Sequence, residues 1–368
     1  MFQYLYKQKI IKYMAIATIQ KIVNIKDVEN SDFLQVCQVL NWQCIINKKE
    51  NLQVGNKIVY IEIDTICPET EQFEFLRKYH FRVKTQKLRG TLSQGLIIPL
   101  TSAINLLSIG TDVSGILGIK KYEKPQATEE EQEKQPTSFW KKQYYFLRYN
   151  YLYKWFPFLK AKQRLKFPKE VSKTDETRVQ NLWDFIQNNY KDKLFYGSFK
   201  LDGSSITLLL SKSLFGKYKT RVCSRNFELF NSNNEWYQVF KITNFEQHLI
   251  ELAEYFKTSN ITVQGEYIGK PQGNPYKVDN QIRLFNIYVN NRLLLPFEFR
   301  EIVHILNIPH CPLYDIIKMP NTIEELLKLS ETPCPLNEKA INEGIVWRCQ
   351  DDGYSFKVVS NKYLLQEK

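Results

Sequence analysis

The stretch GSFKLDGSS, residues 197–205, places Lys200 at the end of a short apolar run and two residues before Asp202. Lysine is almost never fully buried unless it is paired. Lys200 is therefore either the surface end of an ordinary strand and turn or a side chain held in place to react. The tetrapeptide KLDG arises easily by chance, so the segments that accompany it decide between these interpretations.

Five further segments follow KLDG along the chain: SRNFELF (224–230), VQGEYIG (263–269), RLFNIY (283–288), EGIVWR (343–348) and SFKVVSNKYLL (355–365). In this order the set resembles motifs I, Ia, III, IIIa, IV and V of the covalent nucleotidyltransferases, the superfamily of RNA ligases, DNA ligases and mRNA capping enzymes. Agreement at all of these sites is a remote outcome for chance. The resemblance extends over the whole C-terminal part of the chain.

The resemblance implies covalent chemistry at Lys200. A neutral lysine amine attacks the α-phosphate of a nucleoside triphosphate, which requires a pKa lowered by nearby cations and a metal. Acidic side chains hold that metal through water. Cationic side chains stabilise the transferred phosphate and the leaving group, and an aromatic face sandwiches the base.

The resemblance implies a role for each matching position. Lys200 would be the nucleophile, Asp202 would help to organise the metal shell, and Glu266 and Glu343 would supply carboxylates for the ribose and the metal. Arg225 would contact the ribose or a phosphate, Phe285 would stack on the purine, and Lys357 would contact the α-phosphate. Taken singly, Glu266 reads equally well as a surface acid at a strand end, Phe285 as a core ring and Lys357 as a solvated charge. As a set they indicate a nucleotide site.

Two positions depart from the usual motifs. Motif IIIa often reads Phe-Asp, but Asn286 follows Phe285 here. An asparagine still accepts a hydrogen bond, so we expect altered tuning rather than loss of function. Motif V often carries two lysines spaced K-x-K, but Val359 fills the second place and Lys362 is the next lysine. Lys362 is the candidate to take over that role.

Three features favour one clade, the ATP-dependent RNA ligases with an N-terminal OB domain. A barrel-like region precedes the transferase motifs, and 11 residues follow Lys357, which leaves no room for the C-terminal OB domain of capping enzymes and DNA ligases. KTDETRVQN (173–181) resembles the clade's segment before the nucleophile, and KLRGTLSQGL (87–96) resembles its OB domain. The clade implies that Arg178 contacts the nucleotide; an exposed helix arginine is the alternative. It also implies ATP and Mg²⁺ or Mn²⁺.

Residues 14–120 read as short β-branched strands separated by turns, which predicts an OB-type β-barrel domain. Residues 79–90, YHFRVKTQKLRG, bring four cations together: Arg82, Lys84, Lys87 and Arg89. On a small barrel these make a basic rim that could bind an RNA backbone. The alternative is a solvated loop.

Residues 166–368 read as α+β, so the predicted fold class is an OB-type domain followed by a nucleotidyltransferase domain of ATP-grasp-like antiparallel sheets with helices. A helix is expected in TDETRVQNLWDFIQNNY with Thr174 as its N-cap. Further helices are expected in FEQHLIELAEYF, FEFREIVHIL and TIEELLKLS. Residues 1–13 read as an extension, or as a weak organellar presequence.

Half of the net charge of +12 lies in residues 121–168, which carry +6. We expect 121–165 to be a linker whose second half is basic and aromatic; it either packs the two domains together or grips nucleic acid. A basic balance favours a polyanionic partner.

No apolar run approaches the ~18 residues of a membrane span, and no secretory signal is visible. The seven cysteines form no C-x-x-C pair, which indicates reduced thiols in an intracellular protein, in the cytoplasm or nucleus or in an organelle.

The predicted function is an ATP-dependent RNA ligase that seals 3′-OH and 5′-phosphate RNA ends, with a nicked RNA duplex as partner, no membrane, and a monomeric state. A DNA nick ligase and an mRNA capping guanylyltransferase are the enzymatic alternatives. A non-catalytic RNA-binding protein with a degenerate transferase domain is the alternative from another class. The intact set of nucleophile, acids and cations argues against that last alternative, because drift usually removes one of these first.

Overall fold

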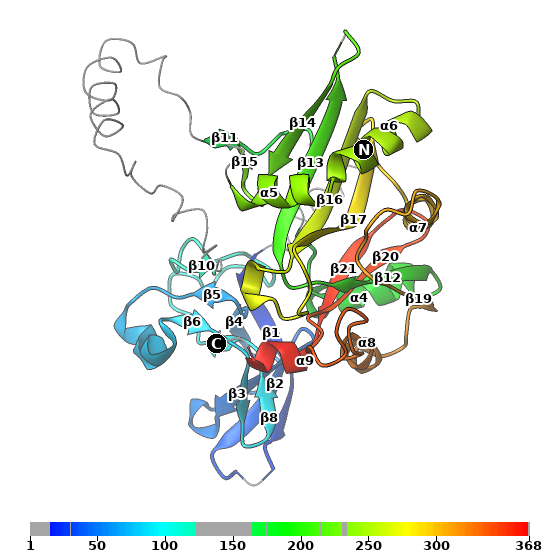
Figure 1. Cartoon of the computed structure of the whole chain (residues 1–368). Coiled ribbons are helices and arrows are strands. Elements are labelled where there is room, and N and C mark those ends of the chain that lie inside the picture. Colours follow the sequence, from blue (N-terminus) through cyan, green and yellow to red (C-terminus); the bar gives the residue numbers. More distant parts are fainter. Residues whose placement is uncertain are drawn as a thin grey trace, which may run out of the picture.

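The computed structural model describes residues 15–29, 31–122, 164–173, 175–213, 215–229 and 234–366. The expected extension at 1–13 and residues 123–163 of the expected linker lie outside this range. Figure 1 shows an N-terminal β domain, coloured blue to cyan, beside a larger α+β domain, coloured green to red.

The N-terminal domain contains a five-stranded antiparallel sheet in the order β3-β2-β1-β4-β9. Its strands are β1 (Ala17–Asp27), β2 (Leu34–Val39), β3 (Trp42–Asn47), β4 (Lys57–Ile61) and β9 (Leu96–Ile98). β1 pairs with β4 through its first half and with β2 through its second half, with a register shift between Ile22 and Asn24. Such an irregularity bends a strand from one side of a barrel to the other, and the expected OB-type fold is confirmed.

Smaller elements complete this domain. They are β5 (Thr65–Ile66), the 3₁₀ helix η2 (Glu71–Tyr79), β6 (Arg82–Val83), the hairpin of β7 (Gln86–Leu88) and β8 (Thr91–Ser93), and β10 (Lys120–Lys121). β5 lies between β10 and β6. The run KIVYIEIDTICP forms two strands rather than one, because Asp64 adopts a left-handed conformation with φ of 61° and turns the chain.

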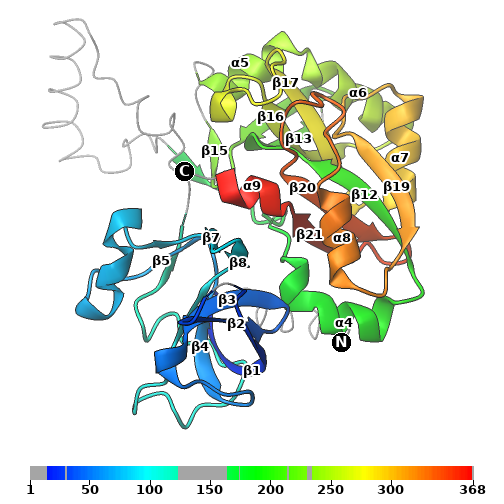
Figure 2. The same cartoon turned by 90° about the horizontal axis from the view of Figure 1, so that it is seen from below.

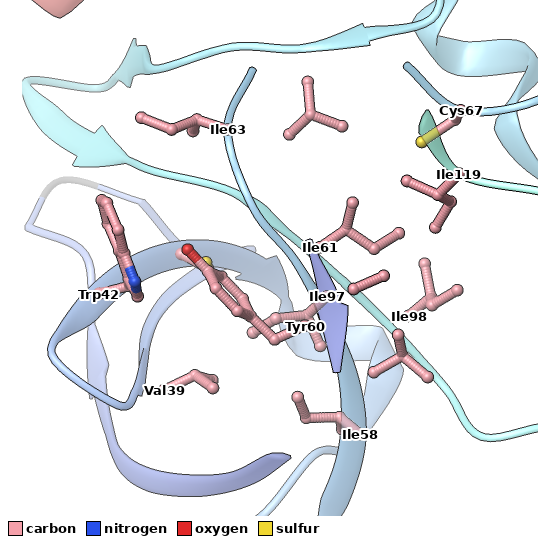
Figure 3. Close-up of a cluster of buried hydrophobic side chains, with 14 of the residues drawn as sticks. Val39, Trp42, Ile58, Tyr60, Ile61, Ile63, Cys67, Ile97, Ile98 and Ile119 are labelled. Carbon is pink, nitrogen blue, oxygen red and sulfur yellow. The ribbon is translucent and has the colours of Figure 1, made fainter. Parts of the chain in front are cut away.

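The core of the β domain includes residues from the far end of the chain. Figure 3 shows Trp42 and Tyr60 among its aliphatic side chains, with the two rings stacked at a centroid distance of 6.3 Å. Val359 and Leu364 belong to the same buried cluster. The last helix, α9 (Asn361–Gln366), therefore packs on the barrel.

The C-terminal domain is built on two antiparallel sheets. A seven-stranded sheet runs in the order β11 (Arg164–Lys166), β15 (Phe227–Leu229), β14 (Tyr218–Cys223), β13 (Ser204–Lys212), β16 (Asn260–Ile268), β17 (Gln281–Val289) and β18 (Arg292–Leu293). A four-stranded sheet runs in the order β19 (Leu313–Lys318), β12 (Leu194–Lys200), β20 (Gly344–Cys349) and β21 (Ser355–Val359). The predicted α+β class is confirmed.

Helices cover the outer faces of the two sheets (Figure 2). They are α4 (Val179–Tyr190), α5 (Glu235–Ile242), α6 (Phe245–Tyr255), α7 (Pro296–Ile305) and α8 (Ile323–Ser330). α6, α7 and α8 occur where the sequence predicts them. The predicted start of α4 at Thr174 is wrong: Thr174 lies outside the described residues, and the helix begins at Val179 with Arg178 in the N-cap position. α5 and α9 are not predicted from the sequence.

No helix in the described part of the chain combines the length and apolar character needed to cross a membrane. All seven cysteines are free thiols with buried side chains. Burial raises the pKa of these thiols, for example to about 12 for Cys37, so they remain protonated.

Candidate active site

Lys200 lies where the chain crosses from one sheet to the other. It is the last residue of β12 and pairs with Gly344 of β20, whereas β13 of the other sheet begins at Ser204. Gly203 permits this crossing, because a Cβ atom there would lie 2.4 Å from the carbonyl oxygen of Tyr267. KLDG is thus a close-packed crossover rather than a hairpin turn.

Strand register brings the other motif residues to the same place. Glu266 on β16 is directly opposite Ser205, the second residue of β13. Glu343 immediately precedes β20, and Lys357 lies on β21 opposite Val346. A cavity of about 630 Å³ between the sheets and the barrel is lined by the predicted residues Arg82, Arg178, Lys200, Asp202, Arg225, Glu266, Phe285, Glu343 and Lys357, together with others.

Acidic side chains surround the amine of Lys200. Its Nζ lies 2.6 Å from Oε1 of Glu343, and the two side chains are 30% and 13% exposed. Burial alone would lower the pKa of Lys200, but the carboxylates of Glu343 and Glu266 outweigh burial and raise it. These carboxylates therefore favour the ammonium form of Lys200, and the lowered pKa that the chemistry requires would depend on the bound metal and nearby cations.

Glu266 and Asp202 complete this acidic side. Burial, together with the negative charges of Glu343 and Asp202, raises the pKa of Glu266 to about 8, although Lys200 opposes the shift. The backbone N–H of Asp202 donates to the hydroxyl of Tyr276 at 2.6 Å. The Oδ2 atom of Asp202 accepts a 2.7 Å hydrogen bond from Tyr363 on α9.

The opposite side of the cavity is cationic and centres on Asp175. Oδ1 of Asp175 lies 3.1 Å from Nζ of Lys357, while Oδ2 pairs with Lys121 and lies 3.7 Å from Arg225. Burial lowers the pKa of Lys357, and the positive charges of Arg178 and Lys200 act in the same direction against Asp175. Asp175 reaches this place because its segment runs beside β21, where the N–H of Lys357 donates to the carbonyl of Thr177 at 2.9 Å.

Arg178 lines the cavity, and its guanidinium is paired to the barrel. Its Nη2 lies 2.6 Å from Oδ2 of Asp64, and Nη2 of Arg82 lies 2.6 Å from Oδ1 of the same residue. Arg82 is 5% exposed, so the prediction that it belongs to an exposed basic rim is wrong. The residue instead joins β6 to the domain interface.

The remaining cations of that rim lie on or beside the β7–β8 hairpin. Lys87 and Arg89 are exposed, and Lys84 is partly buried. Arg89 and Gly90 both have positive φ, 48° and 84°, as a tight two-residue hairpin turn requires. The structure thus presents Lys87 and Arg89 to solvent, outside the cavity.

A β-bulge aims Phe285 into the cavity. β16 and β17 pair Gln264 with Asn286 and Gly265 with Leu284, which leaves Phe285 as the extra residue. Asn286 points to the other side, where its amide donates to Gln264 at 2.9 Å and the side chain is 7% exposed. The unusual asparagine therefore belongs to the buried framework rather than to the cavity wall.

The structure does not bring Lys362 to the cavity. Its Nζ lies 3.0 Å from Glu331, and its side chain is 63% exposed. Val359, in the place of the usual second lysine, is 4% exposed and packs in the barrel core.

Sequence reasoning missed several residues of the cavity wall, namely Asp64, Lys121, Asp175 and Tyr363. Asp175 stands three residues before Arg178 in the segment KTDETRVQN, which is a signal that could have found it. The other residues come from the barrel and from the last helix, and no motif in the sequence marks them.

The acidic side has the donor chemistry of a divalent-metal site. Carboxylate oxygens are the ligands that Mg²⁺ and Mn²⁺ prefer, usually with several retained waters. Within the described ranges, no three acidic, histidine or cysteine side chains are gathered closely enough to hold a metal ion by themselves. Asp202, Glu266 and Glu343 therefore fit a metal held partly through water.

The comparisons with known proteins agree with this geometry. An OB-fold domain model matches residues 16–100, and an RNA ligase model matches residues 193–363. A comparison with curated proteins returned no match.

Among solved structures the chain is similar to the RNA ligase of Naegleria gruberi. A variant with AMP and Mn is 30% identical over 95% of this chain and 98% of that chain, with a TM-score of 0.76. A variant with ATP and Mn has the same identity and coverage with a TM-score of 0.77. The form with PPi is 31% identical over the same shares, with a TM-score of 0.76.

Proposed function

The chain belongs to the RNA ligase family, and we propose that it joins 3′-OH and 5′-phosphate RNA ends through an AMP adduct on Lys200. In the first step the Lys200 amine attacks the α-phosphorus of ATP, a P–N bond forms, and pyrophosphate leaves. In the second step AMP passes to the RNA 5′-phosphate. In the third step the 3′-OH attacks that phosphate, and AMP is released.

One observation carries the proposal: the 2.6 Å contact between Lys200 and Glu343 lies inside a cavity with acids on one side and cations on the other. The ammonium of Lys200 must lose a proton before it can attack, and Glu343 is the nearest acceptor. A divalent metal held by Asp202, Glu266 and Glu343, in part through water, would neutralise phosphate charge and favour the neutral amine.

The cationic side matches the remaining requirements of phosphate transfer. Lys357 and Arg225 line this side of the cavity and would stabilise the α-phosphate as charge develops on it. The bulged ring of Phe285 offers a face for the adenine base. The solved relatives with ATP or AMP and Mn support ATP as the nucleotide and a divalent metal as the cofactor.

For the RNA partner we propose a nicked duplex held by its backbone. The exposed cations Lys87 and Arg89 are candidates for this contact, which would be salt-sensitive and independent of sequence. We further propose that the protein acts as a monomer inside the cell, where its seven buried free thiols stay reduced.

The test starts with labelling by α-³²P-ATP and a divalent metal. The parent protein should become labelled, and Lys200→Ala should not. Lys212→Ala, an exposed lysine on β13, is the matched control and should label normally. Labelling of Lys200→Ala would refute the nucleophile assignment, and preferential labelling by GTP would support a guanylyltransferase instead.

The same proteins should then be assayed on nicked duplexes. Sealing should require a ribonucleotide 3′-OH strand. Equal sealing of an all-DNA nick would favour a DNA ligase, and binding of RNA without any labelling would favour a non-catalytic RNA-binding protein.

A further inference from the structure

The single carboxylate of Asp175 pairs with three cations in the cavity. Lys357 approaches Oδ1 at 3.1 Å, and Lys121 and Arg225 share Oδ2. These contacts hold the pKa of Asp175 well below its usual range although the side chain is only 20% exposed. One negative charge therefore faces three positive charges.

Lys121 comes from a different domain than the other two cations that contact Asp175. It lies on β10, which pairs with β5 of the barrel, opposite Thr65. Lys357 and Arg225 belong to the C-terminal domain. The barrel thus supplies a cation to the cavity that contains Lys200, and the side chain of Lys121 is 47% exposed there.

An anion with more charge and more oxygens than a carboxylate is a better counter-ion for such a cluster. A phosphate group accepts several charge-assisted hydrogen bonds at once, each stronger than a neutral one. Lys357 is also close enough to Lys200 for the charge of the nucleophile to act on it. An anion that replaced Asp175 would therefore lie in the same cavity as the reacting amine.

We propose that Lys121 binds the α-phosphate of the nucleotide together with Lys357, and that this phosphate displaces Asp175, which acts as a resident counter-ion. The two lysines hold the two oxygens of one carboxylate, so a single phosphate in its place lies within reach of both. Lys121 then supplies a second cation beside Lys357. Val359 on β21 stands where the usual motif has its second lysine. This inference rests on the proposed nucleotide-binding function of the cavity.

The test is equilibrium binding of ATP, AMP and adenosine to the full chain carrying Lys200→Ala, which prevents covalent labelling. Adding Lys121→Ala should weaken ATP and AMP about ten- to a hundredfold, the usual effect of losing one hydrogen bond between charged groups. Adenosine, which has no phosphate, should bind as before. Lys121→Arg should restore most of the affinity.

Lys120→Ala is the matched control, because neighbouring residues on a strand point to opposite faces. Lys120 is exposed and is not among the described residues that line the cavity. ATP, AMP and adenosine should therefore bind the Lys120→Ala variant with unchanged affinity. Asp175→Asn should tighten AMP binding several-fold, because the competing carboxylate is gone.

Three results would overturn the inference. Equal weakening of adenosine and AMP would show general damage to the cavity. Unchanged AMP affinity in Lys121→Ala, or a loss confined to ATP, would exclude a contact with the α-phosphate. Absence of ATP binding by the Lys200→Ala parent would refute the proposed function itself and the inference with it.

Discussion

Asp64 joins the two domains, and its replacement by asparagine should be one of the most destabilising conservative changes in the barrel. Its two oxygens accept from Arg82 and Arg178 at 2.6 Å each, and these arginine side chains are 6% and 13% exposed. The change Asp64→Asn preserves shape and removes the charge. Both guanidinium groups would then lose the negative charge of the carboxylate that they share.

The expected loss follows from these two contacts. A hydrogen bond between charged groups contributes about 1.5–3 kcal/mol, and removal of one partner of a buried ion pair costs about 3–5 kcal/mol. We therefore expect Asp64→Asn to lower the free energy of unfolding by about 3–5 kcal/mol. Asn181, which donates to Glu62 at 2.6 Å and accepts from the indole N–H of Trp42 at 2.6 Å, would still connect α4 to the barrel.

Urea unfolding measures this loss, and hydrogen exchange in β4 and α4 shows whether it occurs at the interface. A double-mutant cycle of Asp64→Asn with Arg178→Gln isolates the contact between domains. Asp27→Asn is the matched control, because Asp27 pairs with Lys48 on the surface of the same barrel with 66% of its side chain exposed. The reasoning is refuted if Asp64→Asn unfolds like Asp27→Asn.

Three further predictions concern the cavity, the interface and the hairpin. Tyr363→Phe removes the 2.7 Å hydrogen bond to Asp202. We expect lysyl-AMP to form about three- to tenfold more slowly and to need a higher metal concentration for half-maximal rate. An unchanged metal dependence would contradict this role. Burial raises the pKa of Glu62 from 4.5 to about 7 although Arg178, Asn181, Lys357 and Lys121 oppose the shift. Below pH 4.5 Glu62 is protonated in both the folded and the unfolded protein, and folding pays no penalty for burying its charge. As the pH rises through 7, the buried carboxyl ionises and this stability is lost. Glu62→Gln should therefore stabilise the protein by up to about 3 kcal/mol at pH 8 and little at pH 4. An equal effect at both pH values would argue against this titration. Removal of charge at Lys87 and Arg89 should impair nick sealing more than self-labelling by ATP, and equal loss in both assays would count against an RNA contact.

The strands of both domains were predictable because local patterns specify them. β-branched residues and alternating burial mark β1 to β4, and turn residues separate them. The order of the transferase motifs likewise predicted which residues would meet, and the cavity contains most of them. Such predictions succeed where the information lies within a few residues of sequence.

Contacts between distant segments were not predictable in this way. Arg178 reads as a helix residue, yet it occupies the N-cap position before α4 and pairs with Asp64, 114 positions earlier. Lys121 reads as the start of a linker, yet it pairs with Asp175 in the wall of the cavity. The direction in which Glu343 and Glu266 shift the pKa of Lys200 depends on how close they lie in three dimensions, which the sequence alone does not give.

The most direct test of the account is to locate the AMP adduct. The full chain would be incubated with ATP and a divalent metal, digested, and mapped by mass spectrometry. The account predicts AMP on Lys200 alone, and no adduct in Lys200→Ala. An adduct on Lys121 or Lys357, or no adduct in a protein that still seals RNA, would contradict it.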